Sequence, residues 1–135
     1  MRIYTLTLDD KKKIKQKIKE ALIKREEIIF AYLHGSFIED RPFRDIDVAV
    51  YVDGNHDLTY ELELEEELTR IVGFPVDVRT INNAPVTFRF KVIGGELLFT
   101  KDERVRCEFE ERTLREYHDY EYYLKIYRRE VLGVR

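Results

Sequence analysis

The sequence predicts an α+β fold, a mixed β-sheet flanked by helices with one long helix at the C-terminal end. Two charged segments carry apolar residues at helical spacing. Several short runs rich in β-branched and aromatic residues stand between them and end in turn residues, as strands do. The last thirty or so residues form a charged stretch without Gly or Pro until Gly133. Helices that alternate with strands pack on the faces of a sheet.

The first helix is expected from Asp10 to Arg25, because apolar residues recur there at helical spacing and acidic residues lie at its start. A buried strand is expected over residues 28–33. It ends at His34-Gly35-Ser36, which has the composition of a turn.

A second strand is expected over residues 45–52 and a second helix over residues 57–72, closed by Gly73. The third strand covers residues 76–80. Residues 85–93 fit either a helix or a strand, because apolar residues alternate there strictly. A short strand at 96–100 follows, and Asp102 is expected to cap a final helix that runs to about Leu132.

Length and composition limit the possible classes of protein. We expect one domain, residues 1–135, with 44% hydrophobic and 38% charged residues. Cys107 is the only cysteine, which excludes an internal disulfide and a cysteine-based metal site. No apolar run is long enough for a bilayer and the N-terminus lacks a secretory signal, so the expected location is the cytoplasm. A net charge of −3 makes nucleic acid an unlikely partner.

The turn after the first strand is a candidate phosphate site. Gly35 allows the backbone to approach a phosphate closely, and backbone amides beside the Ser36 hydroxyl suit its oxygens. The alternative is a turn without a ligand, which is the usual role of Gly-Ser at the end of a strand.

Asp45 and Asp47 lie on one face of the second strand, because side chains alternate along a strand. Two acids so close repel each other, and partial burial makes their charge costly. A divalent cation relieves that cost, and Mg²⁺ often shares its ligands between carboxylates and substrate phosphates. The alternative is a solvated acidic face on an edge strand.

Asp77 is a third acid, placed between Val76 and Val78 in the third strand. If that strand lies beside the second, three carboxylates meet near the Gly-Ser turn, as a two-metal site for phosphoryl transfer requires. The alternative is a structural ion pair with Arg79 or another neighbour.

The ordered set of Gly35-Ser36, Asp45-x-Asp47 and Asp77 resembles the polymerase-β-type nucleotidyltransferase superfamily. The closer resemblance is to its minimal members, the MNT-domain (MntA-like) antitoxins often encoded beside a HEPN-domain toxin. Residues 81–85 (Ile-Asn-Asn-Ala-Pro), residues 95–99 (Gly-Glu-Leu-Leu-Phe) and the long charged C-terminal helix extend that resemblance over nearly the whole chain.

The resemblance implies a polymerase-β-like fold and Mg²⁺-dependent transfer of a nucleotidyl group from ATP or another NTP to a hydroxyl. Asp45 and Asp47 would bind two Mg²⁺ ions, and Asp77 the ion that activates the acceptor. Gly35 and Ser36 would hold the β- and γ-phosphates. The family's loop after the Ser commonly has ten residues including an Ala-Arg-Gly segment. Here residues 37–44 give eight, so either Arg41 or Arg44 replaces the missing Arg at the phosphates, or the short loop lowers turnover more than nucleotide or metal binding.

The resemblance further implies a HEPN toxin as partner, with a tyrosine of that toxin as acceptor. Tyrosines around the final helix, about residues 102–132, are expected to contact a partner or a second copy of the chain, and the alternative is that they only pack on the domain. Three other functions remain open. They are an antitoxin that acts by contact alone, an enzyme that modifies a small molecule such as an aminoglycoside, and a nucleic-acid polymerase, which the small size and acidic balance disfavour.

Overall fold

The structure, a computed structural model, describes residues 2–133 of the chain. The predicted domain spans 1–135, so residues 1, 134 and 135 lie outside the described part. In chain order the elements are α1 (Leu8–Ile23), β1 (Ile28–His34), the short 3-10 helix η1 (Ser36–Ile38), β2 (Ile46–Val52), α2 (Leu58–Val72), β3 (Val76–Thr80), α3 (Val86–Ile93), β4 (Glu96–Thr100) and α4 (Glu103–Glu130).

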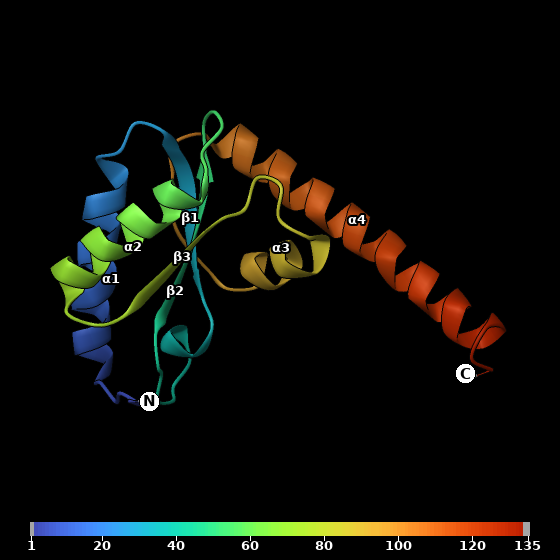
Figure 1. The fold of residues 1–135 in the computed structure, drawn as a ribbon, viewed down its shortest axis with the longest axis horizontal. Coiled ribbons are helices and arrows are strands. Elements are labelled where there is room, and N and C mark those ends of the chain that lie inside the picture. Colours follow the sequence, from blue (N-terminus) through green and yellow to red (C-terminus); the bar gives the residue numbers. More distant parts are fainter. Residues whose placement is uncertain (1, 134–135) are drawn as a thin grey trace.

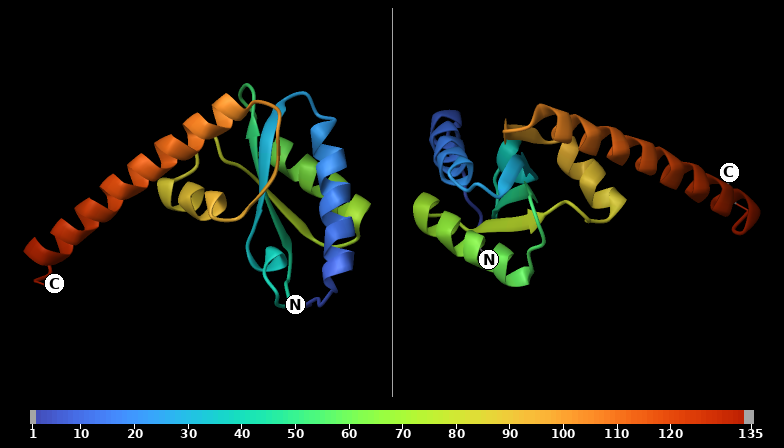
Figure 2. Two further views of the ribbon diagram at one scale, coloured as in Figure 1. Left: turned by 180° about the vertical axis from the view of Figure 1, so that it is seen from behind. Right: turned by 90° about the horizontal axis from the view of Figure 1, so that it is seen from above.

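The four strands form one mixed sheet in the order β3-β2-β1-β4. β1 pairs antiparallel with β2 and with β4, whereas β2 and β3 run parallel. Helices α1 and α2 cover one face of this sheet, and α3 with the first part of α4 covers the other (Figures 1 and 2). The predicted α+β class, with a mixed sheet between helices, is confirmed.

The face under α1 and α2 carries the larger core. Ile18 and Leu22 of α1 and Leu68 of α2 are fully buried against apolar side chains of the sheet. Each such side chain contributes about 1.5–3 kcal/mol through burial. The face under α3 and α4 has a smaller core around Phe30, Tyr32 and Phe109.

The structure corrects the bounds of the first helix and settles whether residues 85–93 form a helix or a strand. The first helix begins at Leu8 instead of Asp10, because the Thr7 side chain accepts a hydrogen bond from the Asp10 amide and the two acids occupy the first turn. It ends at Ile23, two residues before the expected end. Residues 85–93 are helical: Pro85 precedes α3, and Gly94 ends it.

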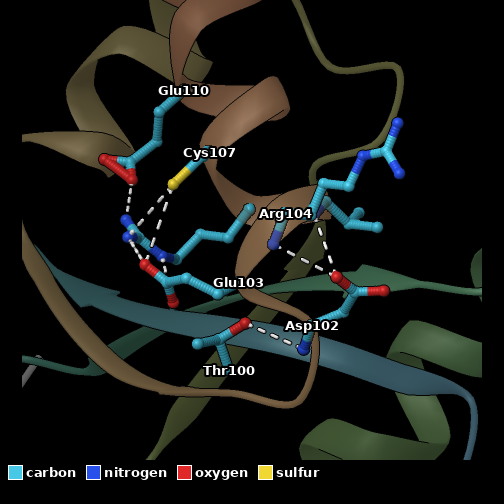
Figure 3. A network of polar contacts seen from close by, with 8 residues as sticks. Thr100, Asp102, Glu103, Arg104, Cys107 and Glu110 are labelled. Atoms are coloured by element: carbon cyan, nitrogen blue, oxygen red, sulfur yellow. Dashed lines mark hydrogen bonds and ion pairs between the residues drawn. The ribbon is translucent and has the colours of Figure 1, made fainter.

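The long helix α4 begins in a polar network (Figure 3). As predicted, Asp102 is its N-cap, and the Asp102 carboxylate accepts from the amides of Arg104 and Val105 at 3.1 and 3.2 Å. Arg106 forms ion pairs with Glu103 and Glu110 in the same network. These contacts stabilise the first turns of α4, and the Asp102 amide, which donates to Thr100 Oγ1 at 3.2 Å, ties the start of the helix to β4.

The middle of α4 is fastened to α3 by the buried Arg89. Its guanidinium donates to Thr113 Oγ1 at 3.1 Å and pairs with Glu116 at 2.5 Å. Phe90 stacks on Tyr117 with ring centroids 3.7 Å apart. Beyond this point the helix projects away from the body (Figures 1 and 2). None of the helices in residues 2–133 has the length and apolar character needed to span a membrane.

Candidate functional site

Three chemically active side chains lie in a row across three neighbouring strands. In the sheet register Asp77 of β3 is opposite Asp47 of β2, and Asp47 is opposite His34, the last residue of β1. Because side chains alternate along a strand, these residues lie on the face that α3 and α4 cover, together with Tyr32 and Ala49. Asp45 directly precedes β2 and lies two residues from Asp47, so it continues the same face beyond the strand.

The turn after β1 is built around Gly35. Its φ of +80° lies in the left-handed region, where side chains other than glycine are strained. A Cβ at Gly35 would also overlap Oδ2 of Asp47. The glycine therefore lets the Asp47 carboxylate lie directly against the backbone of the turn, and it places Ser36 beside the row of acids.

Asp47 carries the main electrostatic strain of the site. Its pKa is raised to about 6, first by burial and then by the negative charges of Asp45 and Asp77, against the lowering effect of Lys91 and Arg79. The other two predicted acids thus both act on the carboxyl group of Asp47. Such a perturbed carboxylate in a group of acids is typical of functional sites.

His34 is 5% exposed, and neither of its ring nitrogens has a hydrogen-bond partner among the described residues. Its pKa is lowered to about 4, first by burial and then by the charges of Lys91 and Arg79, against the raising effect of Asp77. The imidazole is therefore neutral at physiological pH and adds no positive charge beside Asp47. Its ring packs edge-on against Phe88 of α3 at 5.5 Å.

Two basic residues lie beside the acids. The Arg79 guanidinium lies over the Phe88 ring at 5.5 Å. Lys91 follows Phe88 by three residues, so it lies on the same side of α3. Gly95 holds the end of this helix close to β1, since a Cβ there would overlap the Leu33 carbonyl oxygen. Arg79 and Lys91 both lower the pKa of Asp47, as cations near it must.

The eight-residue loop that follows Ser36, residues 37–44, is held from α1. The buried Lys11 donates from Nζ to the carbonyl oxygens of Glu39 at 2.8 Å and Arg41 at 3.4 Å. The predicted phosphate ligand Arg41 is exposed and forms an ion pair with Glu39. Arg44, the other predicted phosphate ligand, is exposed and directly precedes Asp45. The loop thus has a fixed backbone and carries both arginines on its surface.

The residues of the site suit a hard divalent cation in their chemistry. Asp45, Asp47 and Asp77 offer carboxylate oxygens, and the pKa of Asp47 is raised by burial and by the two neighbouring acids despite the nearby cations Arg79 and Lys91. In residues 2–133 no three His, Cys, Asp or Glu side chains already converge in a metal-binding arrangement. The coordination of two Mg²⁺ ions by these acids stays a prediction.

Sequence reasoning alone does not assign His34, Phe88 and Lys91 to the site, and it offers Arg79 only as a structural partner of Asp77. His34 stands beside the turn, but nothing in the sequence distinguishes a site histidine from a packed one. Phe88 and Lys91 belong to the segment that fits either a helix or a strand. Their spacing brings both to one side of the segment only if it is a helix.

Comparison with solved structures gives a consistent fold. A chain in the complex of a tri-AMPylated Shewanella oneidensis HEPN toxin with an MNT antitoxin is 21% identical, with a TM-score of 0.66 over 88% of this chain and 96% of that one. A chain in a toxin–antitoxin complex with AMP-PNP is 22% identical, with a TM-score of 0.72 over 88% and 95% of the two chains. At these identities the likeness concerns the fold.

A search of curated proteins found no match. The family model described as polymerase beta, nucleotidyltransferase matches residues 16–104, which include β1, the Gly35-Ser36 turn and all three acids. The chain therefore belongs to the polymerase-β nucleotidyltransferase family.

Proposed function

We propose that this protein transfers an AMP group from ATP to a tyrosine hydroxyl of a HEPN-domain partner, in a reaction that depends on Mg²⁺. The observation that carries the proposal is Asp47, a carboxyl group with a pKa raised by burial and by Asp45 and Asp77, held directly against the Gly35 turn. Acids of this kind beside a phosphate-compatible turn suit nucleotidyl transfer.

In this reaction the phenol oxygen forms a bond to the α-phosphorus of ATP. The bond between that phosphorus and the bridging oxygen to the β-phosphate breaks, and pyrophosphate leaves with the bonding electrons. The phenol proton passes to the Asp77 carboxylate and from there to water. The turn at Gly35 and Ser36 holds the β- and γ-phosphates, with Arg41 or Arg44 as further ligands in place of the family's missing Arg.

Asp45, Asp47 and Asp77 would hold the Mg²⁺ ions, which supply charge neutralisation at the triphosphate and lower the pKa of the acceptor hydroxyl. The chain's own cations add to that neutralisation. Lys91 lies on the α3 side of the acids, where it reduces the charge repulsion at Asp47. Little covalent chemistry falls to the protein, so the rate depends on position and charge.

The projecting part of α4 supports a protein partner. Tyr122 is 60% and Tyr123 is 69% exposed, and both belong to the part of α4 that projects from the rest of the molecule (Figure 1). Exposed tyrosines are typical of protein interfaces because they combine an apolar ring with a polar tip. The relatives of similar fold include an MNT antitoxin in complex with a HEPN toxin that carries AMP groups.

The experiment mixes the chain with a HEPN-domain protein, Mg²⁺ and ATP labelled at the α-phosphate. Label should appear on a tyrosine of the partner, and label at the γ-phosphate should not. The Asp45→Asn/Asp47→Asn variant should transfer at least about a hundredfold more slowly, since each removed charge weakens metal and phosphate binding. Asp53→Asn, a change in the exposed turn after β2, is the matched control and should transfer normally.

The second candidate is an antitoxin that neutralises its partner by contact alone, and the exposed tyrosines of α4 favour it equally. The same variant separates the two functions. A contact antitoxin with Asn at positions 45 and 47 would still suppress the toxin in cells, whereas a catalytic antitoxin would lose that protection. The Tyr122→Lys/Tyr123→Lys variant should weaken binding to the partner, and with it protection in cells, whichever of the two functions holds.

A further inference from the structure

A pocket of about 490 Å³ lies at the outer edge of β3, between α2 and the start of α3. Asp77 forms part of its wall, and so do Arg79 and Thr80 of the same strand. Asp77 therefore has one neighbour in the sheet, Asp47, and this pocket on its other side. The Gly35 turn lies beyond Asp47, so the pocket and the turn flank the row of acids from opposite sides.

The outer edge of β3 is partly capped by α2. The amide of Val76 donates to Thr69 Oγ1 at 3.1 Å, and the amide of Val78 donates to Glu65 Oε1 at 2.9 Å. Both acceptors are side chains of α2. Two outward amides of β3 are thus paired with α2, which hinders an incoming chain from adding to this part of the edge by backbone hydrogen bonds. A side chain can still enter the pocket.

The walls of the pocket suit an aromatic side chain. Leu58 and Leu62 of α2 lie one helical turn apart, and they are 68% and 54% exposed although both are large and apolar. Phe88 of α3 forms part of the wall beside them. An aromatic ring between these side chains buries apolar surface on both partners.

The charge of the pocket selects against anions. Glu61, Glu65 and Asp77 contribute three carboxylates to the wall, and Arg79 contributes one cation. With Asp77 occupied by Mg²⁺ as proposed, Glu61 and Glu65 still outnumber Arg79 on the wall, so a neutral group with a cation beside it is favoured over an anion.

We propose that this pocket holds the acceptor tyrosine, presented on a segment of the partner that carries a basic residue next to it. The proposal rests on the proposed function. It places the attacking oxygen beside Asp77 and the leaving pyrophosphate at the Gly35 turn. These are opposite sides of the acids, as the roughly in-line arrangement of attacking and leaving oxygens requires. The bonds made and broken are those of the transfer described above, with the phenol proton taken up by Asp77.

The first test introduces a charged side chain into the apolar wall. Leu62→Arg should slow transfer of AMP to the HEPN-domain protein at least about tenfold and leave the calorimetric Kd for Mg²⁺ and ATP within about twofold of wild type, because the pocket binds the acceptor and not the nucleotide. Ile71→Arg is the matched control, since Ile71 is 39% exposed on the same helix and does not line the pocket. This control should leave both quantities unchanged.

The second test uses charge. The probes are the peptides acetyl-Arg-Tyr-Ala-amide and acetyl-Glu-Tyr-Ala-amide, with AMP transfer followed by mass spectrometry. Wild type should prefer the Arg peptide at least about fivefold, and Glu61→Lys should reduce or reverse that preference. Glu63→Lys changes an exposed acid of α2 outside the pocket, and this control should keep the preference for the Arg peptide.

The outcomes separate the two proposals. Normal transfer by Leu62→Arg, or no peptide preference in wild type, overturns the acceptor pocket and leaves the transferase function in place. Loss of ATP binding in Leu62→Arg alone assigns the pocket to the nucleoside and also overturns it. If wild type neither binds Mg²⁺ and ATP nor transfers AMP, the proposed function fails first, and the pocket proposal fails with it.

Discussion

The two faces of the sheet differ in the side chains that they bury. One buries apolar side chains, and the other also buries charged groups and polar groups that are unpaired within the described residues. Under α1 and α2 the strands present apolar side chains that are almost fully buried against helix residues such as Ile18 and Leu22. Under α3 the same strands carry Asp77, Asp47 and His34, with a raised carboxyl pKa and two unpaired imidazole nitrogens within the described part of the chain. One face supplies the larger core, and the other combines a smaller core with groups that lower the stability of the fold.

This division explains how a small chain tolerates a costly site. Partly buried like charges and an unpaired imidazole each cost on the order of 1–3 kcal/mol. The larger core on the opposite face offsets that cost without touching the site. Changes to the two faces should therefore have separable effects, on folding for one and on ligand binding for the other.

The largest effect is expected in the core under α1. Leu22→Ala removes a fully buried side chain and should lower the free energy of unfolding by about 2–5 kcal/mol in urea denaturation. The neighbouring Ile23→Ala, at 44% exposure, should cost less than about 1 kcal/mol. Nucleotide affinity per folded molecule should stay unchanged in both, and a lower affinity in Leu22→Ala would show that the faces are coupled.

Next in size is the turn at Gly35. Gly35→Ala should weaken binding of Mg²⁺ and ATP about a hundredfold, because the added Cβ displaces the Asp47 carboxylate. Gly54→Ala is a matched control, since Gly54 has a similar φ of +87° and its nearest contact is His56 Nε2 at 3.9 Å. Both changes strain the backbone, but Gly54→Ala should bind the nucleotide normally.

Asp47→Asn should stabilise the chain in the absence of metal, by about 1–2 kcal/mol at about pH 8. The Asp47 carboxyl, with its pKa raised to about 6, binds its proton more tightly in the folded than in the unfolded chain. Wild-type stability is thus lowered as the pH rises from about 4 to 6, and the gain from Asn should vanish near pH 4. Thermal unfolding at both ends of this range measures the effect, with Asp53→Asn as control. If Asp47→Asn were less stable than wild type at about pH 8, the charged Asp47 carboxylate would not be destabilising the fold.

The smallest effect concerns Lys91. Lys91→Ala should weaken ATP binding about three- to tenfold, since an exposed cation near the phosphates is partly screened by salt. The effect should shrink in high salt. Lys125→Ala, a change of equal charge on the projecting part of α4, should leave the affinity as it was, and equal losses in the two variants would indicate only a general effect of net charge.

Most of the fold and the centre of the site can be predicted from the sequence. Asp47 and Asp77 are readable because acids rarely stand between apolar residues of a buried strand, and Asp45 because it lies two residues before Asp47. Gly35 is readable because it ends a buried strand. The meeting of the acids depends on the parallel pairing of β2 with β3, which the long helix between the two strands permits.

The surroundings of the acids are less readable, for physical reasons. Apolar residues alternate over residues 86–92 as in a strand, but the segment is helical. Phe90 stacks on the ring of Tyr117 in α4, which covers part of its apolar surface. That contact joins residues far apart in the sequence. Glu65 belongs to a run of acids typical of a solvated helix face, yet it accepts the outward amide of Val78. Contacts of this kind join separate elements, so they can be identified only from the three-dimensional arrangement of the helices and strands.

The central claim, that Asp45 and Asp47 bind the metal and nucleotide, is tested most directly by calorimetric titration. ATP with Mg²⁺ is titrated into wild type and into Asp45→Asn/Asp47→Asn at about pH 7.5. We predict metal-dependent binding in wild type that is lost in the variant, and about tenfold weaker wild-type binding one pH unit below the Asp47 pKa of about 6. Equal binding in both proteins, or none in wild type, would contradict the account and favour an antitoxin that acts by contact.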